Sequence, residues 1–246
     1  MSFAGKVVVV TGGSRGLGKE MVEAYAARGA DVVVASRKLD NCVAVADVVR
    51  ARHGVRALPM ACNVSHWDSC DELVHTVYAE FGRVDVLVNN AGLSPLYPSV
   101  DQIGEALFDK VISVNLKGPF RLSALVGTRM AGGEGGAILN ISSMEAIRPT
   151  PDSLPYAAAK AGLDALTVGM AKAFGPLVRV NAIQCGPFLT DISAAWDPEA
   201  RDAFASTLAL RRCAAPGEIV GAAMYLTGDE ASFCTGAVLR LDGGSA

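Results

Sequence analysis

The fold is decided by one stretch near the start of the chain, Val7-Val-Val-Val-Thr-Gly-Gly-Ser-Arg-Gly-Leu-Gly18. The four valines predict a buried strand, and the apolar residues Met21, Val22 and Tyr25 after the glycines predict an amphipathic helix. Glycines between them let the backbone approach a pyrophosphate, which then meets the free N–H groups of the helix N-terminus. The stretch therefore predicts a strand, turn and helix that bind a dinucleotide, although its glycine spacing differs from the general G-x-G-x-x-G pattern.

Strands and helices alternate along the rest of the chain. Apolar runs rich in valine and isoleucine predict seven strands, at Val7–Val10, Asp31–Ala35, Arg56–Ala61, Val84–Val88, Gly136–Ile141, Val178–Ile183 and Ala237–Arg240. Helices are expected near Gly16–Ala27, Lys38–Arg52, Trp67–Phe81, Glu105–Met130, Leu154–Phe174 and Pro216–Leu226, with helical patches around Pro198–Leu208. Strands that are apolar on both faces are typical of a parallel sheet covered by helices. We therefore expect a single α/β domain over residues 1–246, with a doubly wound, Rossmann-type parallel sheet of about seven strands.

Composition and charge indicate a compact enzyme. The 246 residues are 51% apolar and 19% charged, and the formal net charge is −3. An acidic chain gives no reason to expect nucleic acid or an anionic membrane as a partner. No apolar run approaches the roughly 20 residues that span a bilayer, and the first valines precede a glycine turn rather than a signal-peptide cleavage site. We expect a cytoplasmic protein.

Six cysteines are scattered along the chain, and in a cytoplasmic protein we expect them to be reduced thiols. One grouping, Cys62, His66, Cys70 and His75, contains side chains that bind metals. It lacks the closely spaced ligand pairs of structural zinc sites, so we expect no metal.

A tyrosine and a lysine four residues apart, Tyr156 and Lys160, predict an acid–base site. This spacing places both side chains on one helix face, with Ser143 thirteen residues upstream of the tyrosine. A phenol titrates near pH 10, and a cation beside it lowers that pKa. The pair could then exchange a proton with an alcohol or carbonyl, while a serine hydroxyl steadies the same oxygen.

Together with Asn89-Asn-Ala-Gly92 and Asn115, these motifs closely resemble the short-chain dehydrogenase/reductase family in order and spacing, from Gly5 to Gly244. The resemblance implies hydride transfer between a nicotinamide and a carbonyl or secondary alcohol. It also implies that the catalytic residues are Asn115, Ser143, Tyr156 and Lys160, with Asn115 holding a water that links Lys160 to solvent.

The resemblance also implies a cofactor site. Its residues are Gly12, Ser14, Arg15, Gly16, Leu17, Gly18, Ser36, Arg37, Lys38, Asn63, Val64, Asn90, Ala91, Gly92, Tyr156, Lys160, Pro187, Phe188 and Thr190. The chain departs from the family at Asn63, where Asp is usual, and at Cys185, where Pro is usual.

Charge at the end of the second strand favours NADP(H) over NAD(H). An acidic residue there would bind the free ribose hydroxyls of NAD, but the chain has Arg37 and Lys38 and no acid before Asp40. Arg15 in the glycine turn adds a cation. Arginine can pair with a 2′-phosphate that a carboxylate would repel.

The substrate is less well defined. Expected contacts are Ser94, Ser143, Glu145, Tyr156, Phe188 and Trp196, most of them small or apolar, with a lid over residues 188–212. The chain resembles 3-oxoacyl-carrier-protein reductases as well as sugar, polyol and xenobiotic alcohol dehydrogenases. A 3-oxoacyl-carrier-protein reductase and a non-catalytic NADP-binding sensor are the alternatives. An apolar last strand at the sheet edge, with apolar faces on two long helices, predicts a homotetramer, with a dimer as second choice.

Overall fold

The computed structural model describes residues 1–190 and 197–245. Within them, seven parallel strands form one sheet in the order β3-β2-β1-β4-β5-β6-β7. Their bounds are β1 (Val7–Thr11), β2 (Asp31–Ser36), β3 (Ala57–Ala61), β4 (Val86–Asn89), β5 (Gly136–Ser143), β6 (Val178–Cys185) and β7 (Val238–Leu241). The chain has the predicted α/β Rossmann-type fold. Strand order reverses between β1 and β4, and ligands of such sheets bind at the carboxyl ends of the strands on either side of that point.

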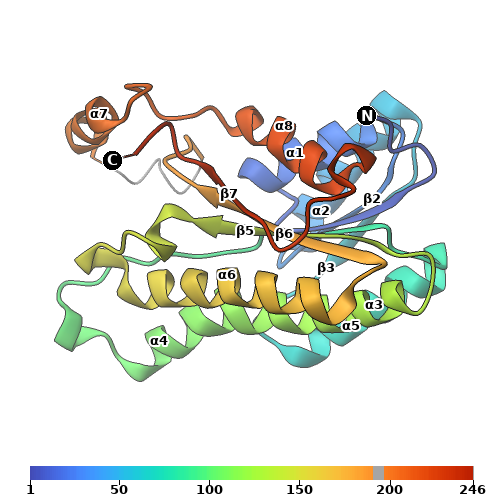
Figure 1. Ribbon diagram of the computed structural model, residues 1–246, viewed down its shortest axis with the longest axis horizontal. Helices are drawn as coiled ribbons and strands as arrows, with labels where there is room; N and C mark the ends of the chain where they lie inside the picture. Colours follow the sequence, from blue (N-terminus) through green and yellow to red (C-terminus); the bar gives the residue numbers. More distant parts are fainter. Residues whose placement is uncertain (191–196, 246) are drawn as a thin grey trace.

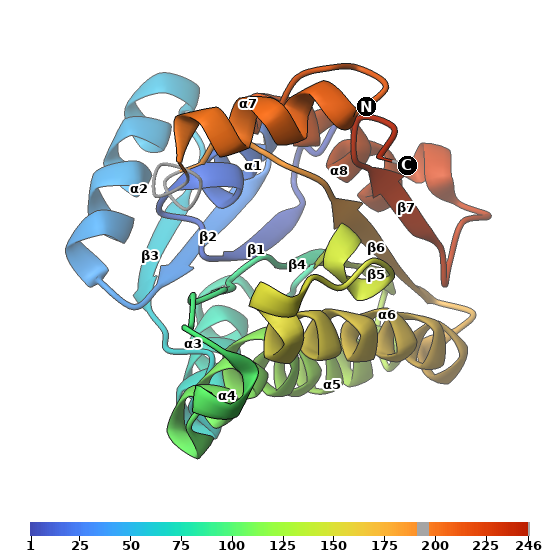
Figure 2. The same ribbon diagram turned by 90° about the vertical axis from the view of Figure 1, so that its left-hand side faces the viewer.

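Helices cover both faces of the sheet (Figure 1). One face carries α1 (Gly16–Ala26), α2 (Leu39–His53) and α8 (Ile219–Thr227). The other carries α3 (Trp67–Phe81), α5 (Gly118–Ala131) and α6 (Leu154–Phe174), with α4 (Glu105–Ile112) packed against α6. A further helix, α7 (Pro198–Thr207), lies with the start of α6 at the carboxyl ends of the strands, the side that faces the viewer in Figure 2. Among the described residues, no helix is long and apolar enough to cross a membrane.

The four valines of β1 explain why this strand lies at the centre. Val8 and Val10 point into the core beneath α1, α2 and α8, whereas Val7 and Val9 point into the core on the opposite face. All four are at most 4% exposed. Burying a valine side chain contributes roughly 1.5 kcal/mol or more to folding. The strand is thus packed on both faces, and this packing fixes the position at which the glycine turn begins.

One predicted helix differs from the structure. The expected continuous helix Glu105–Met130 is three pieces: α4, a π-helical turn at Ser113–Lys117, and α5. Side-chain hydrogen bonds explain the widened turn. The fully buried Asn115 amide donates to the carbonyl of Val111 in the same helix and to that of Leu93 in a separate loop. Wider turns of this kind often occur at functional sites.

Smaller corrections concern element ends. Strands β5 and β6 run two residues further than expected, to Ser143 and Cys185, because the two strands stay paired there. Strand β4 begins at Val86, two residues later than expected. The last predicted helix begins as a 3₁₀ turn at Pro216–Glu218, which leads directly into α8.

Candidate active site

The glycine turn lies between β1 and α1 and is held by the segment that follows β4. Gly12 has φ +66°, and a Cβ on Gly18 would lie 2.2 Å from the Gly12 carbonyl oxygen. Asn90 donates from its side chain to the Thr11 carbonyl at 2.9 Å, and the Thr11 hydroxyl accepts the backbone N–H of Ala91 at 3.1 Å. The turn is therefore too tight for side chains at Gly12 and Gly18. It presents bare backbone beside the N-terminus of α1, as a pyrophosphate requires.

Two cations follow β2 at the same edge of the sheet. Arg37 and Lys38 are exposed, and neither side chain has an ion pair among the described residues. Beside them the Ser14 hydroxyl of the glycine turn donates to the Ser36 hydroxyl at 2.9 Å. Arg15 is also exposed in this turn. The predicted basic edge therefore lies next to the predicted phosphate-binding turn.

The remaining predicted cofactor residues are dispersed along this edge. Asn63 and Val64 follow β3, with the Asn63 side-chain oxygen accepting from the Ser65 hydroxyl at 2.9 Å. Pro187 and Phe188 follow β6 and pair through their backbone with Ala214. The structure thus brings the predicted cofactor residues to the carboxyl ends of β1 to β6.

Ser143, Tyr156 and Lys160 come together as predicted. Ser143 ends β5, and the other two lie one turn apart at the start of α6. The ammonium of Lys160 donates to the Ile141 carbonyl at 2.7 Å and lies 5.5 Å from the centroid of the Tyr156 ring. Lys160 is only 4% exposed. A buried lysine bound to a neutral carbonyl is a charge without an ionic partner.

Burial dominates the acidity of this pair. It raises the pKa of Tyr156 to about 12, although a hydrogen bond with the Ser143 hydroxyl acts in the opposite direction. Burial also lowers the pKa of Lys160 to about 8, against the nearby side chains of Cys185 and Asp164. The expectation of a lowered pKa for Tyr156 is therefore wrong for this structure, because burial raises that pKa and Lys160 is not among the groups that shift it. At neutral pH both groups carry their protons, so Tyr156 is placed to donate one.

Asn115 reaches this site through a loop. Its side chain both accepts from the N–H of Leu93, at 3.2 Å, and donates to the Leu93 carbonyl, at 2.8 Å. A Cβ on Gly92, the preceding residue, would lie 3.0 Å from the Asn115 side-chain oxygen and 3.8 Å from the Lys160 ammonium. Asn115 thus fixes the backbone that passes beside Lys160.

A shallow apolar hollow adjoins Tyr156. It is lined by Pro95, Tyr97, Leu107, Val111, Ser153, Pro155 and Tyr156. The sequence did not predict five of these as site residues, namely Tyr97, Leu107, Val111, Ser153 and Pro155. No motif in the sequence singles them out.

The predicted substrate residues lie in different surroundings. Ser94 is partly exposed in the loop after β4, and Phe188 is 5% exposed in the core next to α1. The Glu145 carboxylate accepts hydrogen bonds from the chain itself, at Thr150 and Ser153. Trp196, like residues 191–195 of the predicted lid, lies outside the described residues.

The grouping of Cys62, His66, Cys70 and His75 does not form a cluster. Both cysteines are buried and both histidines are exposed. Within the described ranges, no three histidine, cysteine or acidic side chains come close enough to hold a metal ion. All six cysteines are free thiols.

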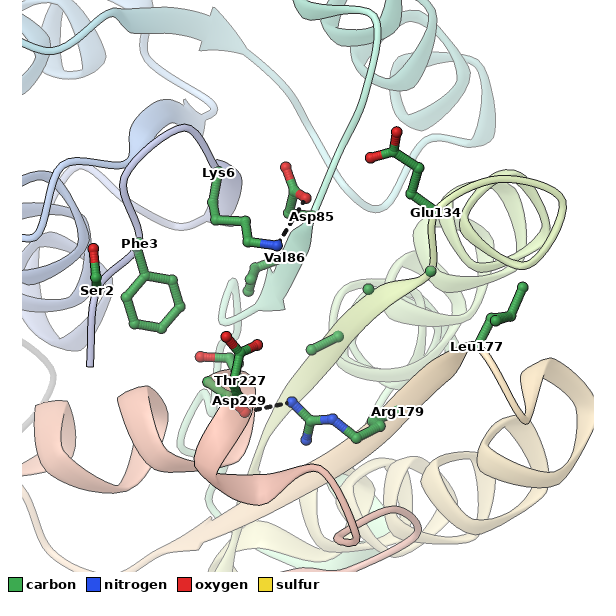
Figure 3. Close-up of a pocket in the computed structure, with 14 residues that line it drawn as sticks. Ser2, Phe3, Lys6, Asp85, Val86, Glu134, Leu177, Arg179, Thr227 and Asp229 are labelled. Carbon is green, nitrogen blue, oxygen red and sulfur yellow. Dashed lines mark hydrogen bonds and ion pairs between the residues drawn. The ribbon is translucent and has the colours of Figure 1, made fainter.

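A separate polar cavity of about 200 Å³ lies at the opposite, amino ends of the strands (Figure 3). It contains Lys6, Asp85, Arg179 and Asp229, none of which the motifs single out. Arg179 donates to the carbonyls of Leu226 and Gly228 at the end of α8, and Lys6 lies 3.7 Å from Asp85. Lys6 thus pairs with Asp85, and Arg179 binds backbone carbonyls.

Comparison with known proteins places this geometry in a family. The family model for short chain dehydrogenases matches residues 6–201. The chain is 35% identical to the 3-oxoacyl-[acyl-carrier-protein] reductase of Thermotoga maritima, over 99% of both chains. It is also 35% identical to the D-threitol dehydrogenase of Mycolicibacterium smegmatis, over 98% of this chain and 92% of that one.

A solved structure agrees with these relatives. A protein from Beutenbergia cavernae, named for NAD(P)-dependent gluconate 5-dehydrogenase activity, contains bound NADP at low occupancy. It shares 33% identity over 98% of this chain and 97% of its own, with a TM-score of 0.93. The chain therefore belongs to the short-chain dehydrogenase family of oxidoreductases.

Proposed function

We propose that this protein is an NADP(H)-dependent oxidoreductase that interconverts a small carbonyl compound and its secondary alcohol. One observation carries the proposal. Ser143, Tyr156 and Lys160 converge beside a glycine turn that is open to a phosphate. The nicotinamide, when bound, supplies the hydride. The protein supplies the site, the proton and the orientation of the substrate.

The described residues fit such a cofactor. The bare backbone at Gly12 and Gly18 can take the pyrophosphate at the N-terminus of α1. Arg37 and Lys38 can pair with a 2′-phosphate, since neither side chain has an ion pair within the described residues. The NADP bound to the Beutenbergia relative supports the choice of phosphorylated cofactor.

Tyr156 acts as the general acid in carbonyl reduction. Its high pKa keeps the phenol protonated at neutral pH, and the proton moves from its hydroxyl to the carbonyl oxygen as negative charge develops there. The Ser143 hydroxyl accepts the N–H of Glu145 at 3.2 Å and shares a hydrogen bond with Tyr156. When a substrate binds, the Ser143 hydrogen turns from Tyr156 to the substrate oxygen. Lys160 stabilises the resulting phenolate. Alcohol oxidation uses the same groups in reverse.

Two further proposals concern regions around this site. The first is that the chain forms a single domain over residues 1–246, in which the predicted lid, residues 188–212, serves the substrate site; residues 191–196 of this lid lie outside the described residues. The protein assembles as a homotetramer, because apolar side chains such as Phe108, Phe120, Val168 and Leu239 are 38–44% exposed. Side chains of this size are normally covered by a partner when they gather on faces of helices and edge strands.

A substrate panel tests the proposed function. NADPH and NADH oxidation are measured with ketones, keto-sugars and a 3-oxoacyl thioester, the last because the Thermotoga relative is named as a 3-oxoacyl-carrier-protein reductase. We expect turnover of at least one substrate, faster with NADPH. NADPH binding, followed by fluorescence, without any turnover would instead favour the sensor. Light scattering gives the mass: a value near 25 kDa, the mass of one chain, would contradict the tetramer.

A further inference from the structure

The start of α6 is held by two side chains that no motif assigns. Helix α6 begins at Leu154, directly after a 3₁₀ turn at Pro151–Ser153, and its third residue is Tyr156. The first N–H groups of a helix have no partner inside it and need one from elsewhere. Ser153, at the N-cap position, makes no side-chain capping hydrogen bond. The cap of the helix that carries Tyr156 must therefore come from another part of the chain.

Tyr97 supplies that cap. Its hydroxyl accepts the backbone N–H of Leu154 at 2.8 Å and donates to the carbonyl of Pro151 at 2.6 Å. One phenol thus bridges both ends of the turn before α6. Tyr97 belongs to the loop after β4, whose first residues bind Thr11 in the glycine turn. The loop therefore connects the predicted cofactor site to the start of the catalytic helix.

Glu145 holds the same turn from the other side. Its carboxylate accepts the N–H of Thr150 at 2.8 Å and the hydroxyl of Ser153. Its own backbone N–H donates to the Ser143 hydroxyl. A single residue therefore contacts both the predicted catalytic serine and the segment that precedes the predicted catalytic tyrosine.

We propose that Tyr97 and Glu145 are positioning residues that fix the Tyr156 hydroxyl relative to the Ser143 hydroxyl. The proposal rests on the reaction proposed above, in which these two hydroxyls meet one carbonyl oxygen. Their alignment requires the first turn of α6 to stay formed, and a misplacement of about 1 Å can cost up to 100-fold in rate. The Glu145 carboxylate thus acts on the reaction by holding Thr150 and Ser153, without contacting the substrate.

The first test is Tyr97→Phe, which removes only the hydroxyl. We expect kcat to fall about tenfold, with KM and the Kd for NADPH within about twofold of wild type. Tyr225→Phe is the matched control: Tyr225 lies on α8, on the far face of the sheet, and its hydroxyl makes no hydrogen bond within the described ranges. A rise in KM with unchanged kcat would overturn the proposal, since it would indicate direct contact between Tyr97 and the substrate.

The second test separates hydrogen bonding from charge at position 145. Glu145→Ala removes both acceptor oxygens and should lower kcat about tenfold. Glu145→Gln keeps one acceptor oxygen without the charge and should recover most of that loss. Equal losses in the two variants would contradict a positioning role that depends on hydrogen bonds.

The third test does not depend on turnover. Hydrogen–deuterium exchange is followed in peptides covering residues 150–160 of the wild type, Tyr97→Phe and Tyr225→Phe. We expect faster exchange there only in Tyr97→Phe, because the Leu154 N–H loses its acceptor. Unchanged exchange in Tyr97→Phe would contradict the proposal that Tyr97 holds the start of α6. Another outcome is a wild type that binds NADPH and turns over no substrate, while exchange at residues 150–160 is still faster in Tyr97→Phe than in the wild type. That result would contradict the proposed function but would support the contacts of Tyr97 with Pro151 and Leu154.

Discussion

The two ends of the sheet differ in how many partners their charged groups have. At the amino ends, Asp85 is 5% exposed and accepts hydrogen bonds from the N–H of Val7 and from Arg83, with Lys6 also nearby (Figure 3). Arg179 at the same end donates to three backbone carbonyls. Each of these charged groups has partners that compensate for burial, as a structural role requires.

At the carboxyl ends, the charged groups have fewer partners. Lys160 is buried against a neutral carbonyl, and burial lowers its pKa. Arg37 and Lys38 have no ion pairs within the described ranges. A buried charge with few partners adds little to stability, and titratable groups whose pKa values are shifted by burial are common at functional sites. The difference indicates that one end maintains the fold while the other is kept for a ligand.

The variant with the largest expected effect on this difference between the two ends is Tyr156→Phe. If the carboxyl end is the reactive one, loss of this hydroxyl lowers kcat by about 10²–10⁴-fold, the usual contribution of a general acid. NADPH binding should remain close to that of the wild type. Initial rates and a fluorescence titration measure the two effects. Near wild-type rates would show that the proton comes from another group.

The matching change at the amino end is Asp85→Ala. It removes the acceptor of three donors, so we expect the free energy of unfolding to fall by about 3 kcal/mol, with kcat unchanged in the folded protein. Urea unfolding at equal protein concentration measures the loss. Asp47→Ala is the control, because among the described residues Asp47 forms only an exposed pair with Arg50, worth under about 1 kcal/mol. A large loss of kcat in Asp85→Ala would contradict a purely structural role for the amino ends of the strands.

Charge reversal at Arg37 tests the proposed 2′-phosphate site formed by Arg37 and Lys38 after β2. Arg37→Asp should weaken NADPH relative to NADH about tenfold, which corresponds to about 1.4 kcal/mol, since an attractive pair becomes a repulsive one. The ratio of kcat/KM for the two cofactors measures the change. A wild type that already prefers NADH would contradict the assignment of Arg37.

The smallest effect concerns pH. Lys160 has a pKa of about 8 in the folded protein, below its ordinary value of 10.5, so it is protonated below pH 8 and loses its charge above it. If the cation supports proton donation by Tyr156, kcat/KM for carbonyl reduction is level below pH 8 and halved near it. A rate profile between pH 6 and 10 tests this. A flat profile through pH 8 would contradict a role for the charge of Lys160.

Most of the fold and the main site residues could be predicted because their signals are local. The valines of β1 and the spacing from Tyr156 to Lys160 act within one element. The hydrogen bonds of the Tyr97 hydroxyl could not be predicted, because its partners are backbone atoms of Pro151 and Leu154, which no side-chain pattern encodes. The pKa of Tyr156 was predicted in the wrong direction because spacing gives proximity to a cation but says nothing about burial.

The π-helical turn at Ser113–Lys117 has a consequence for how this region can change. Because successive helical residues are about 100° apart, the turn sets the angle at which α4 meets α6 relative to the angle at which α5 meets the sheet. Loss of one residue within the turn would replace its wide hydrogen bonds by ordinary α-helical ones and would rotate α4 by about 100° relative to α5. Because α4 packs against α6, we expect a change of length in this turn to disturb the site more than a substitution on the exposed side of α4 would.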